Sequence, residues 1–302
     1  MSPPGIPKGE HRRAQRKDRP GSVPRAPRVD AHHHVWRLDR GDYGWLTPAL
    51  VPIYRDFGLA DLEPLRRAAG VDATVLVQAA PTEAETRFLL ATARASAGWV
   101  RGVVGWVDCA DPDAVARVSA LARDPLLKSI RPMLQDIPDP AWVLRAEVQP
   151  VLAALPSLGL RFDALVKPAQ LPALLGLLDR YPDLDVVVDH GGKPPIAAGE
   201  REPWASLMAA LARHPRVHCK LSGLVTEAGT GWSVDALAPW VDHLLDRFGV
   251  ARLLWGSDWP VVDLGGGYAR WVTATDALLA GLSTAEREAV LGGNARRFYG
   301  LD

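Results

Sequence analysis

Eight short apolar runs recur along the chain about 25 to 45 residues apart, and this repetition constrains the fold more than any other feature. The runs cover residues 29–36, 73–78, 100–107, 127–133, 160–166, 186–190, 217–221 and 253–258. Between them lie segments with helical spacing of apolar residues, at 59–70, 83–97, 112–122, 148–155, 171–181, 203–214, 234–248 and 268–279. This alternation predicts an α/β fold built on parallel strands.

The predicted strands are apolar on both faces, as parallel strands must be when each side of the sheet is covered. Eight strand–helix units predict a single-domain (β/α)8 TIM barrel, which needs about 250 residues. A doubly wound open sheet is the alternative. No strand in this chain is followed by a G-x-G-x-x-G pattern or a phosphate-binding loop, so the barrel is favoured.

The N-terminal 28 residues differ in composition from the rest of the chain. They are rich in Pro, Gly, Lys and Arg, and they hold eight basic and two acidic residues, a net charge of +6. A segment with so little apolar content cannot offset the entropy lost on ordering. Residues 1–28 are therefore predicted to form a disordered tail and residues 29–302 the barrel. A nucleic-acid-binding arm is the sharper alternative, but the tail lacks interleaved aromatic residues.

The overall composition argues against several classes of protein. The 302 residues include 35 basic and 35 acidic side chains, so no bulk charge favours a nucleic-acid or membrane partner. Cys109 and Cys219 are the two cysteines, and their spacing fits neither a disulfide framework nor a zinc site. No run of 18 apolar residues and no secretory signal is found. We therefore expect a cytoplasmic protein, and the sequence leaves both a monomer and a homo-oligomer open.

Two histidines end the first predicted strand. His32 and His34 are two residues apart, so their side chains point to the same side of the strand, while His33 between them points to the other. Two imidazoles that converge on one point suit a metal ion or an electrophilic oxygen. A surface cluster without function is the alternative, because the pattern is short.

Other polar side chains also follow the predicted strands, where TIM barrels carry their chemistry. Gln78 ends the second strand, Arg131 lies in the fourth, His190 ends the sixth, Lys220 lies in the seventh and Asp258 ends the eighth. Asp258 follows Leu-Leu-Trp after two small residues, and burying a carboxylate there is costly unless it binds a cation or donors. These positions predict one polar site at the carboxyl ends of the strands.

At this point the chain resembles a known family. The stretches that carry the likeness are 29–36 (VDAHHHVW), 75–79 (VLVQA), 103–108 (VVGWVD), 130–136 (IRPMLQD), 189–194 (DHGGKP) and 256–260 (GSDWP). They are similar to signatures of the amidohydrolase superfamily, in the branch that hydrolyses sugar lactones and 2-pyrone-4,6-dicarboxylate. The resemblance covers residues from about 28 to 302 in the order that the family has them. It implies a lactonase that acts on an aldonolactone such as L-fuconolactone.

The resemblance also implies roles for individual residues. Asp258 is expected to act as general base on water, while His32, His34 and His190 polarise the carbonyl directly or through an ion. The side chains expected to hold or wall the substrate are Arg131, Lys220, Gln135, Gln78, Trp36, Tyr43 and Trp45.

The metal content follows from one departure from the family pattern. Members with two metal ions have a lysine at the end of the fourth strand and a histidine at the end of the fifth, whereas this chain has Ile-Arg-Pro at 130–132 and Phe-Asp-Ala at 162–164. At most one divalent ion, Zn or Mn, is therefore expected. Its ligands would be His32, His34 and Asp258, with His190 as a fourth, and catalysis without a metal stays open.

Two other functions remain as alternatives. The first is a metal-dependent, non-oxidative decarboxylase of an aromatic or muconate-type acid, which normally needs the fifth-strand histidine that this chain lacks. The second is a catalytically silent barrel that binds a ligand, against which the intact histidines and Asp258 argue. A serine-nucleophile lactonase is not supported, because the chain has no G-x-S-x-G.

Overall fold

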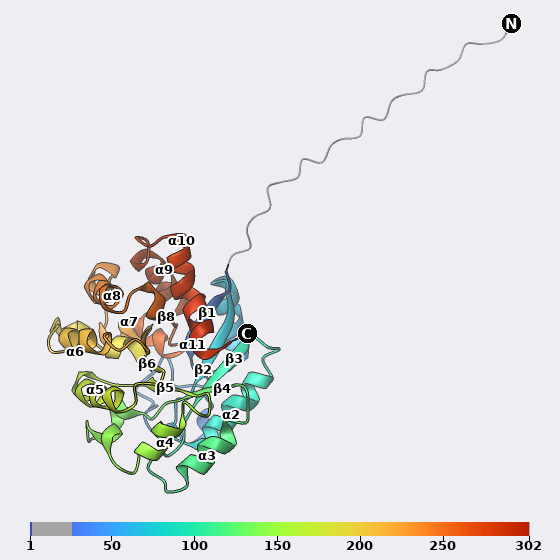
Figure 1. Ribbon diagram of the computed structural model, residues 1–302. Helices are drawn as coiled ribbons and strands as arrows, with labels where there is room; N and C mark the ends of the chain where they lie inside the picture. The colour runs from blue at the N-terminus through green and yellow to red at the C-terminus, as the bar shows by residue number, and fades with distance from the viewer. Residues whose placement is uncertain (2–25, 302) are drawn as a thin grey trace.

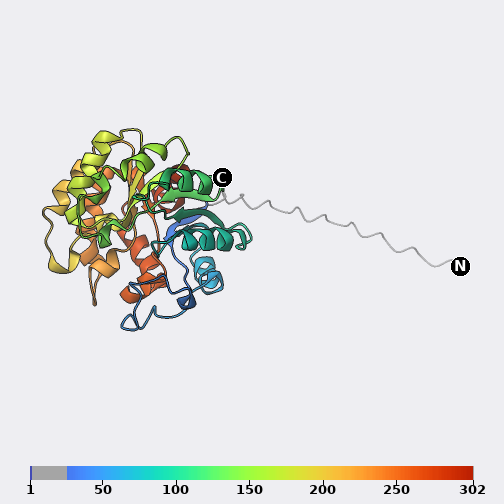
Figure 2. The same ribbon diagram turned by 90° about the horizontal axis from the view of Figure 1, so that it is seen from below.

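The computed structural model describes Met1 and residues 26–301 and confirms the (β/α)8 TIM barrel (Figures 1 and 2). Most of the predicted tail, residues 2–25, lies outside the described residues. The strands are β1 Arg28–His33, β2 Val71–Val77, β3 Val100–Gly105, β4 Leu127–Ile130, β5 Arg161–Ala164, β6 Val186–Val188, β7 Val217–Leu221 and β8 Leu253–Trp255. They pair in parallel and in chain order. Each of the eight apolar runs therefore overlaps a strand.

The barrel closes between β1 and the segment that follows β8. The Asp258 amide donates to the His32 carbonyl at 2.7 Å, and the His34 amide donates to the Trp259 carbonyl at 2.7 Å. The residues that close the sheet are thus also residues predicted for the site.

Eleven α-helices are found in the part of the chain that the structure describes. They are α1 Leu59–Ala68, α2 Glu83–Arg94, α3 Ala114–Leu121, α4 Gln149–Ala154, α5 Leu171–Arg180, α6 Trp204–Leu211, α7 Leu224–Glu227, α8 Val234–Phe248, α9 Tyr268–Leu278, α10 Thr284–Glu288 and α11 Asn294–Tyr299. Eight of them fall in the predicted amphipathic segments, and α7, α10 and α11 were not predicted. Within residues 26–301, no helix has the length and apolarity needed to cross a bilayer.

The helices form where the sequence supplies both a cap and an apolar face. Thr82 accepts the Glu85 amide at 3.1 Å to cap α2, and Ser233 accepts the Ala236 amide at 3.2 Å to cap α8. Helix α8 buries residues three and four positions apart, namely Leu237, Trp240, Val241, Leu244 and Phe248. That spacing turns one stripe of the helix toward the barrel.

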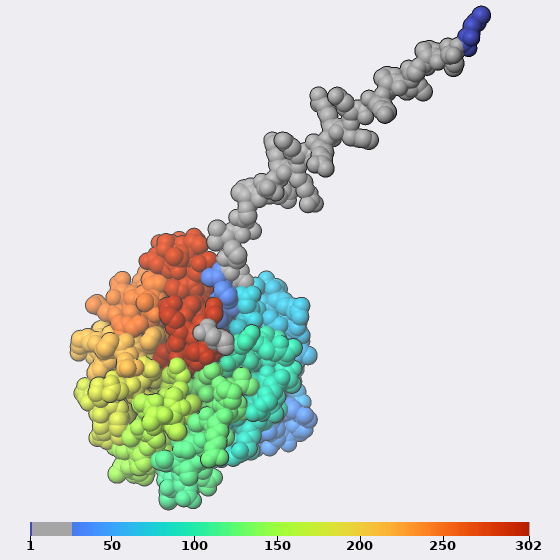
Figure 3. Space-filling model, turned by 45° about the vertical axis from the view of Figure 1, so that its right-hand side comes forward, coloured from blue at the N-terminus to red at the C-terminus, as the bar shows by residue number. Residues whose placement is uncertain are grey.

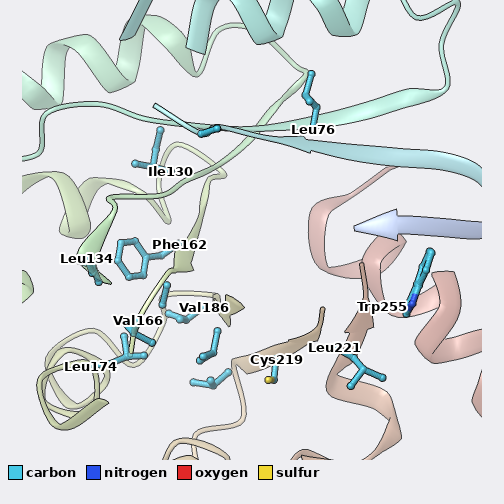
Figure 4. Close-up of a cluster of buried hydrophobic side chains, with 14 of the residues drawn as sticks. Leu76, Ile130, Leu134, Phe162, Val166, Leu174, Val186, Cys219, Leu221 and Trp255 are labelled. Atoms are coloured by element: carbon cyan, nitrogen blue, oxygen red, sulfur yellow. The ribbon is translucent and has the colours of Figure 1, made fainter. Parts of the chain in front are cut away.

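Two apolar layers hold the barrel together. The outer layer lies between strands and helices, where Leu76, Ile130, Phe162 and Val186 belong to one buried cluster that also includes helix residues such as Leu174 (Figure 4). The inner layer fills the barrel with smaller side chains, including Val29, Val75, Val187 and Leu254. Both free cysteines are buried.

The C-terminal segment closes the amino end of the barrel. Phe298, Tyr299 and Leu301 pack with the inner side chains of β1, β2 and β8. In Figure 3 the red C-terminal segment lies directly against the blue residues of the first strand. A π-helical segment, Ala289–Gly293, joins α10 to α11 and brings Gly292 against the start of β1. This contact allows the last helix to lie close to the barrel.

Replacing Gly292 by alanine should destabilise the protein. A Cβ atom at Gly292 would lie 2.2 Å from the Pro27 carbonyl oxygen and 3.0 Å from the Val29 nitrogen, which are backbone atoms that cannot rotate away. We expect a cost of about 1–3 kcal/mol, measured as a lower melting temperature. Gly293→Ala is the matched control, because its nearest atom is the mobile Arg297 Nη1 at 3.5 Å. Equal melting temperatures for the two variants would contradict this packing.

Candidate active site

A cavity of about 210 Å³ opens at the carboxyl ends of the strands. The predicted residues that line it are His34, Arg131, Gln135, His190, Asp258 and Trp45. The predicted residues that do not border it are His32, Gln78, Lys220, Trp36 and Tyr43. The structure therefore separates the predicted set into side chains that can touch a ligand and side chains that lie behind them.

The histidines of β1 are directed by a shift in strand register. Asp30 pairs with Thr74 and His33 pairs with Leu76, so β1 carries one extra residue between these pairs. Bulges of this kind re-aim side chains and are frequent beside active sites. His32 and His34 face each other, with 3.2 Å between their Nε2 atoms. His33 points away, as alternation predicted, and bonds Thr74 Oγ1 at 2.8 Å.

Asp258 is the point on which the imidazoles converge. Its Oδ1 lies 3.3 Å from His34 Nε2, 3.7 Å from His32 Nε2 and 3.8 Å from His190 Nε2. Burial alone would raise the pKa of Asp258, but His190, His34 and His32 outweigh it and hold the pKa below its ordinary value. The carboxylate is therefore charged at neutral pH.

Asp258 and His190 both adopt left-handed backbone conformations, with φ of 60° and 54°. Residues other than glycine rarely do so, and each costs of order 1–3 kcal/mol. Such strain gathers at functional sites, where surrounding contacts over-determine it. Because these residues follow β8 and β6, the strained turns direct both side chains to the same place.

Two glycines make room for the imidazoles. A Cβ atom at Gly223 would lie 2.5 Å from His190 Nδ1, and one at Gly256 would lie 2.7 Å from His32 Cβ. Real Cβ atoms do not approach other atoms so closely. Gly223 is thus small because the His190 ring packs on it, and Gly256 because the backbone and Cβ of His32 do.

Hydrogen bonds on the far ring nitrogens orient the histidines toward the cavity. His34 Nδ1 donates to the Val77 carbonyl at 2.8 Å, which leaves Nε2 as the unprotonated nitrogen of the neutral ring. His190 Nδ1 bonds Ser222 Oγ at 2.9 Å. Burial lowers the pKa of His190 to about 4, so this ring is neutral at physiological pH. Such partners on the outer nitrogen are typical of metal-binding histidines.

Lys220 lies beneath the site in a buried group of charges. Its Nζ is 2.6 Å from Asp163, 2.9 Å from Asp189 and 3.1 Å from His32 Nδ1. All these side chains are fully buried. Lys220 therefore supports His32 from below and does not reach the cavity. Tyr299 of the C-terminal helix donates to Asp163 at 2.7 Å.

Asp163 and Asp189 were given no role by sequence reasoning. A charged residue inside an apolar strand, as Asp163 is in β5, was the available signal, because such a group needs a buried partner. Asp189 accepts from Arg131 Nη1 at 3.0 Å as well as contacting Lys220. Although burial raises the pKa of a carboxyl, the adjacent Lys220 ammonium holds the pKa of Asp189 well below its ordinary value.

Arg131 borders the cavity and is fixed by buried partners. Gln78 Nε2 donates to the Arg131 carbonyl at 2.6 Å, and Arg131 Nη2 donates to the Gln78 carbonyl. Gln78 is fully buried, so the structure places it as a support for Arg131. Gln135 borders the cavity and donates to Asp136 at 3.3 Å.

Trp45 provides the aromatic wall of the cavity. Its Nε1 donates to the Ala79 carbonyl at 2.7 Å. Trp36 packs edge-on against it, with 5.5 Å between ring centroids, and Tyr43 lies behind Trp36. Trp36 and Tyr43 are buried, so they position Trp45 and do not face the cavity.

The donor atoms fit one divalent metal ion. His32, His190 and Asp258 each offer an atom within 4.8 Å of the others, and His34 Nε2 is closer still to both His32 and Asp258. Tetrahedral zinc with ligands at about 2.0–2.1 Å places donor atoms roughly 3.3 Å apart. Two or three imidazoles and a carboxylate are also donors that Zn accepts.

Comparison with known proteins places this geometry in a family. The chain is 47% identical over 279 residues to an L-fucono-1,5-lactonase of Burkholderia ambifaria, covering 91% of this chain and 96% of that one. It is 36% identical over 294 residues to an L-fucono-1,5-lactonase of Burkholderia multivorans, covering 91% and 97%. A crystal structure of an amidohydrolase from Burkholderia multivorans with bound zinc is 36% identical, with a TM-score of 0.86, and covers 92% and 100%.

The family model described as amidohydrolase matches residues 29–301. This match spans the whole described barrel apart from its first residues. The chain therefore belongs to the amidohydrolase family.

Proposed function

We propose that this protein hydrolyses the ring ester of a small sugar lactone, an aldonolactone such as L-fucono-1,5-lactone. The observation that carries the proposal is the carboxylate of Asp258, held within 3.3–3.8 Å of three histidine nitrogens beside the cavity. The 47% identity to an L-fucono-1,5-lactonase supports the choice of substrate. Structures of decarboxylases are only 15–16% identical, which supports a common fold alone. No observation among the described residues favours the decarboxylase or the silent barrel.

The reaction adds water across the ester bond of the ring. Asp258 takes a proton from the attacking water while the water oxygen bonds to the carbonyl carbon. The bond from that carbon to the ring oxygen then breaks, and the ring oxygen receives a proton to give the open hydroxy acid. Arg131 lies beside the cavity, where its guanidinium can hold the carbonyl oxygen or a substrate hydroxyl as charge develops.

The protonation of the site suggests how the histidines contribute. His34 Nδ1 donates to the Val77 carbonyl, so in the tautomer with a single proton its Nε2 carries the lone pair and is suited to hold a cation. The lowered pKa of Asp258 keeps it charged but makes it a weak base. A divalent ion held by these donors would supply the electrophile and make the water more acidic.

The Asp258→Asn variant should lose most of its activity and keep its fold. Asparagine keeps the shape but cannot accept the proton of water, and a general base contributes about 10²- to 10⁴-fold. We expect a fall in kcat of that size, measured as proton release on a panel of aldono-1,4- and 1,5-lactones. Asp263→Asn, in the same loop but away from the cavity, is the control. Turnover by Asp258→Asn close to that of the unaltered enzyme would remove Asp258 from the mechanism.

Removing divalent metal should abolish most of the activity. We expect about one Zn or Mn per chain by elemental analysis, a fall in kcat of at least about tenfold after dialysis against a chelator, and recovery on adding either metal. His190→Ala should reduce the amount of bound metal, whereas His243→Ala, whose ring bonds the Ala205 carbonyl, should not. Full activity of metal-free protein would show that the residues act without an ion.

A further inference from the structure

A second cavity of about 550 Å³ adjoins the proposed active site. Trp45, Met133 and Asp136 line both cavities, so a ligand in one can extend into the other. The remaining walls come from segments that follow β1, β2, β3 and β4. None of the residues given a part in the reaction borders this second space. The residues that line this second cavity can therefore serve a function other than catalysis.

The second cavity carries three tryptophans. Trp45, Trp106 and Trp142 are each half-buried and lie around the same space. Partly exposed indole rings in a hollow offer flat apolar faces with little loss of side-chain entropy on binding. The C–H face of a sugar ring is a flat partner of this kind.

The polar groups of the second cavity are carboxylates. Among the described residues, those that line it include Asp42, Asp108 and Asp136 but no lysine, arginine or histidine. Ionised carboxylates accept hydrogen bonds and donate none, so they suit hydroxyl groups. They also repel phosphate and carboxylate groups, which makes an anionic ligand unfavourable here.

One oxygen of the Asp42 carboxylate has no hydrogen-bond donor among the described residues. Its Oδ2 accepts from Arg40 at 2.6 Å and from Thr82 at 2.8 Å. Its Oδ1 is buried and has no hydrogen-bond partner among the described residues. A buried acceptor without a partner is costly, so the Asp42 carboxylate is incompletely satisfied by the described residues.

We propose that the second cavity binds an uncharged sugar unit attached to the lactone, so that the enzyme accepts glycosylated aldonolactones. This inference rests on the proposed function, because the lactone ring would occupy the smaller cavity of about 210 Å³. The second sugar would stack on the tryptophans and donate hydroxyl protons to the carboxylates. Only the ring ester is hydrolysed, with water as co-reactant. The glycosidic bond stays intact, and the product is a glycosylated hydroxy acid.

Kinetics on matched lactones test the proposal. The probes are an aldono-1,5-lactone and the same lactone carrying one neutral hexose at O2, O3 or O4. We expect at least one glycosylated lactone to have the higher kcat/KM. Trp142→Ala should lower that value at least tenfold, against less than about threefold for the unsubstituted lactone. Trp142→Phe keeps a flat face and should restore most of the loss. Trp99 is another half-buried tryptophan and lies outside both cavities. The Trp99→Ala variant should therefore leave unchanged the ratio of kcat/KM for the glycosylated lactone to kcat/KM for the unsubstituted lactone.

Binding of the corresponding hydroxy acids separates the two proposals. The glycosylated acid should bind more tightly than the unsubstituted acid by calorimetry, and Trp142→Ala should remove the difference. Hydrolysis of unsubstituted lactones without any such difference would overturn the second site and leave the lactonase. Absence of all hydrolysis with the difference intact would overturn the lactonase alone. An equal gain from a phenyl or alkyl substituent would overturn the assignment to sugar.

Discussion

The contact between the Lys220 ammonium and the carboxylates of Asp163 and Asp189 is the interaction on which the site depends. A buried charge is tolerated only when it is paired, and removing one partner of such a pair costs about 3–5 kcal/mol. Here one lysine is within 3 Å of two carboxylates and 3.1 Å from His32. The pairing holds β5, β6 and β7 together inside the barrel and fixes the ring of His32 from below.

The same group of charges joins the two ends of the barrel. Tyr299, in the last helix, donates to Asp163 from the amino end, while Asp189 accepts from Arg131 toward the cavity. The C-terminal segment is therefore connected to the site through two carboxylates. Burial and the neighbouring Lys220 keep the pKa of His32 well below its ordinary value, so this histidine remains neutral. A neutral ring can act as a ligand or accept a proton.

Closure of the barrel and assembly of the site are one structural event. The backbone of His32 and Asp258 pairs where the first and last strands meet, and their side chains face each other 3.7 Å apart. The Asp258 backbone, whose φ is positive, takes part directly in these contacts. The contacts of the barrel offset the backbone strain at Asp258. The proposed catalytic side chains thus lie at or directly after the strand ends, and the walls of the second cavity come from longer segments that follow the strands, as is general for this fold.

Much of this arrangement could be predicted from the sequence. Strand and helix order depends on local periodicity, and a carboxylate or histidine at the end of an apolar run is visible without a structure. Strand alternation predicted that His32 and His34 share one side and that His33 takes the other, whereas the extra residue in β1 that directs them was found only in the structure. Helices α10 and α11 were missed because they are short and lie after the last predicted repeat.

The barrel, the strand ends as the place of the candidate site, and Asp258 with three histidines as its proposed members could all be predicted from the chain's own pattern. The folded arrangement was needed to show that Lys220 and Gln78 are buried supports, and that Trp45 rather than Trp36 or Tyr43 walls the cavity. It also revealed the partners Asp163 and Asp189 and the second cavity. The physical reason is that periodicity is local, whereas the depth of a long side chain depends on partners more than 50 residues away.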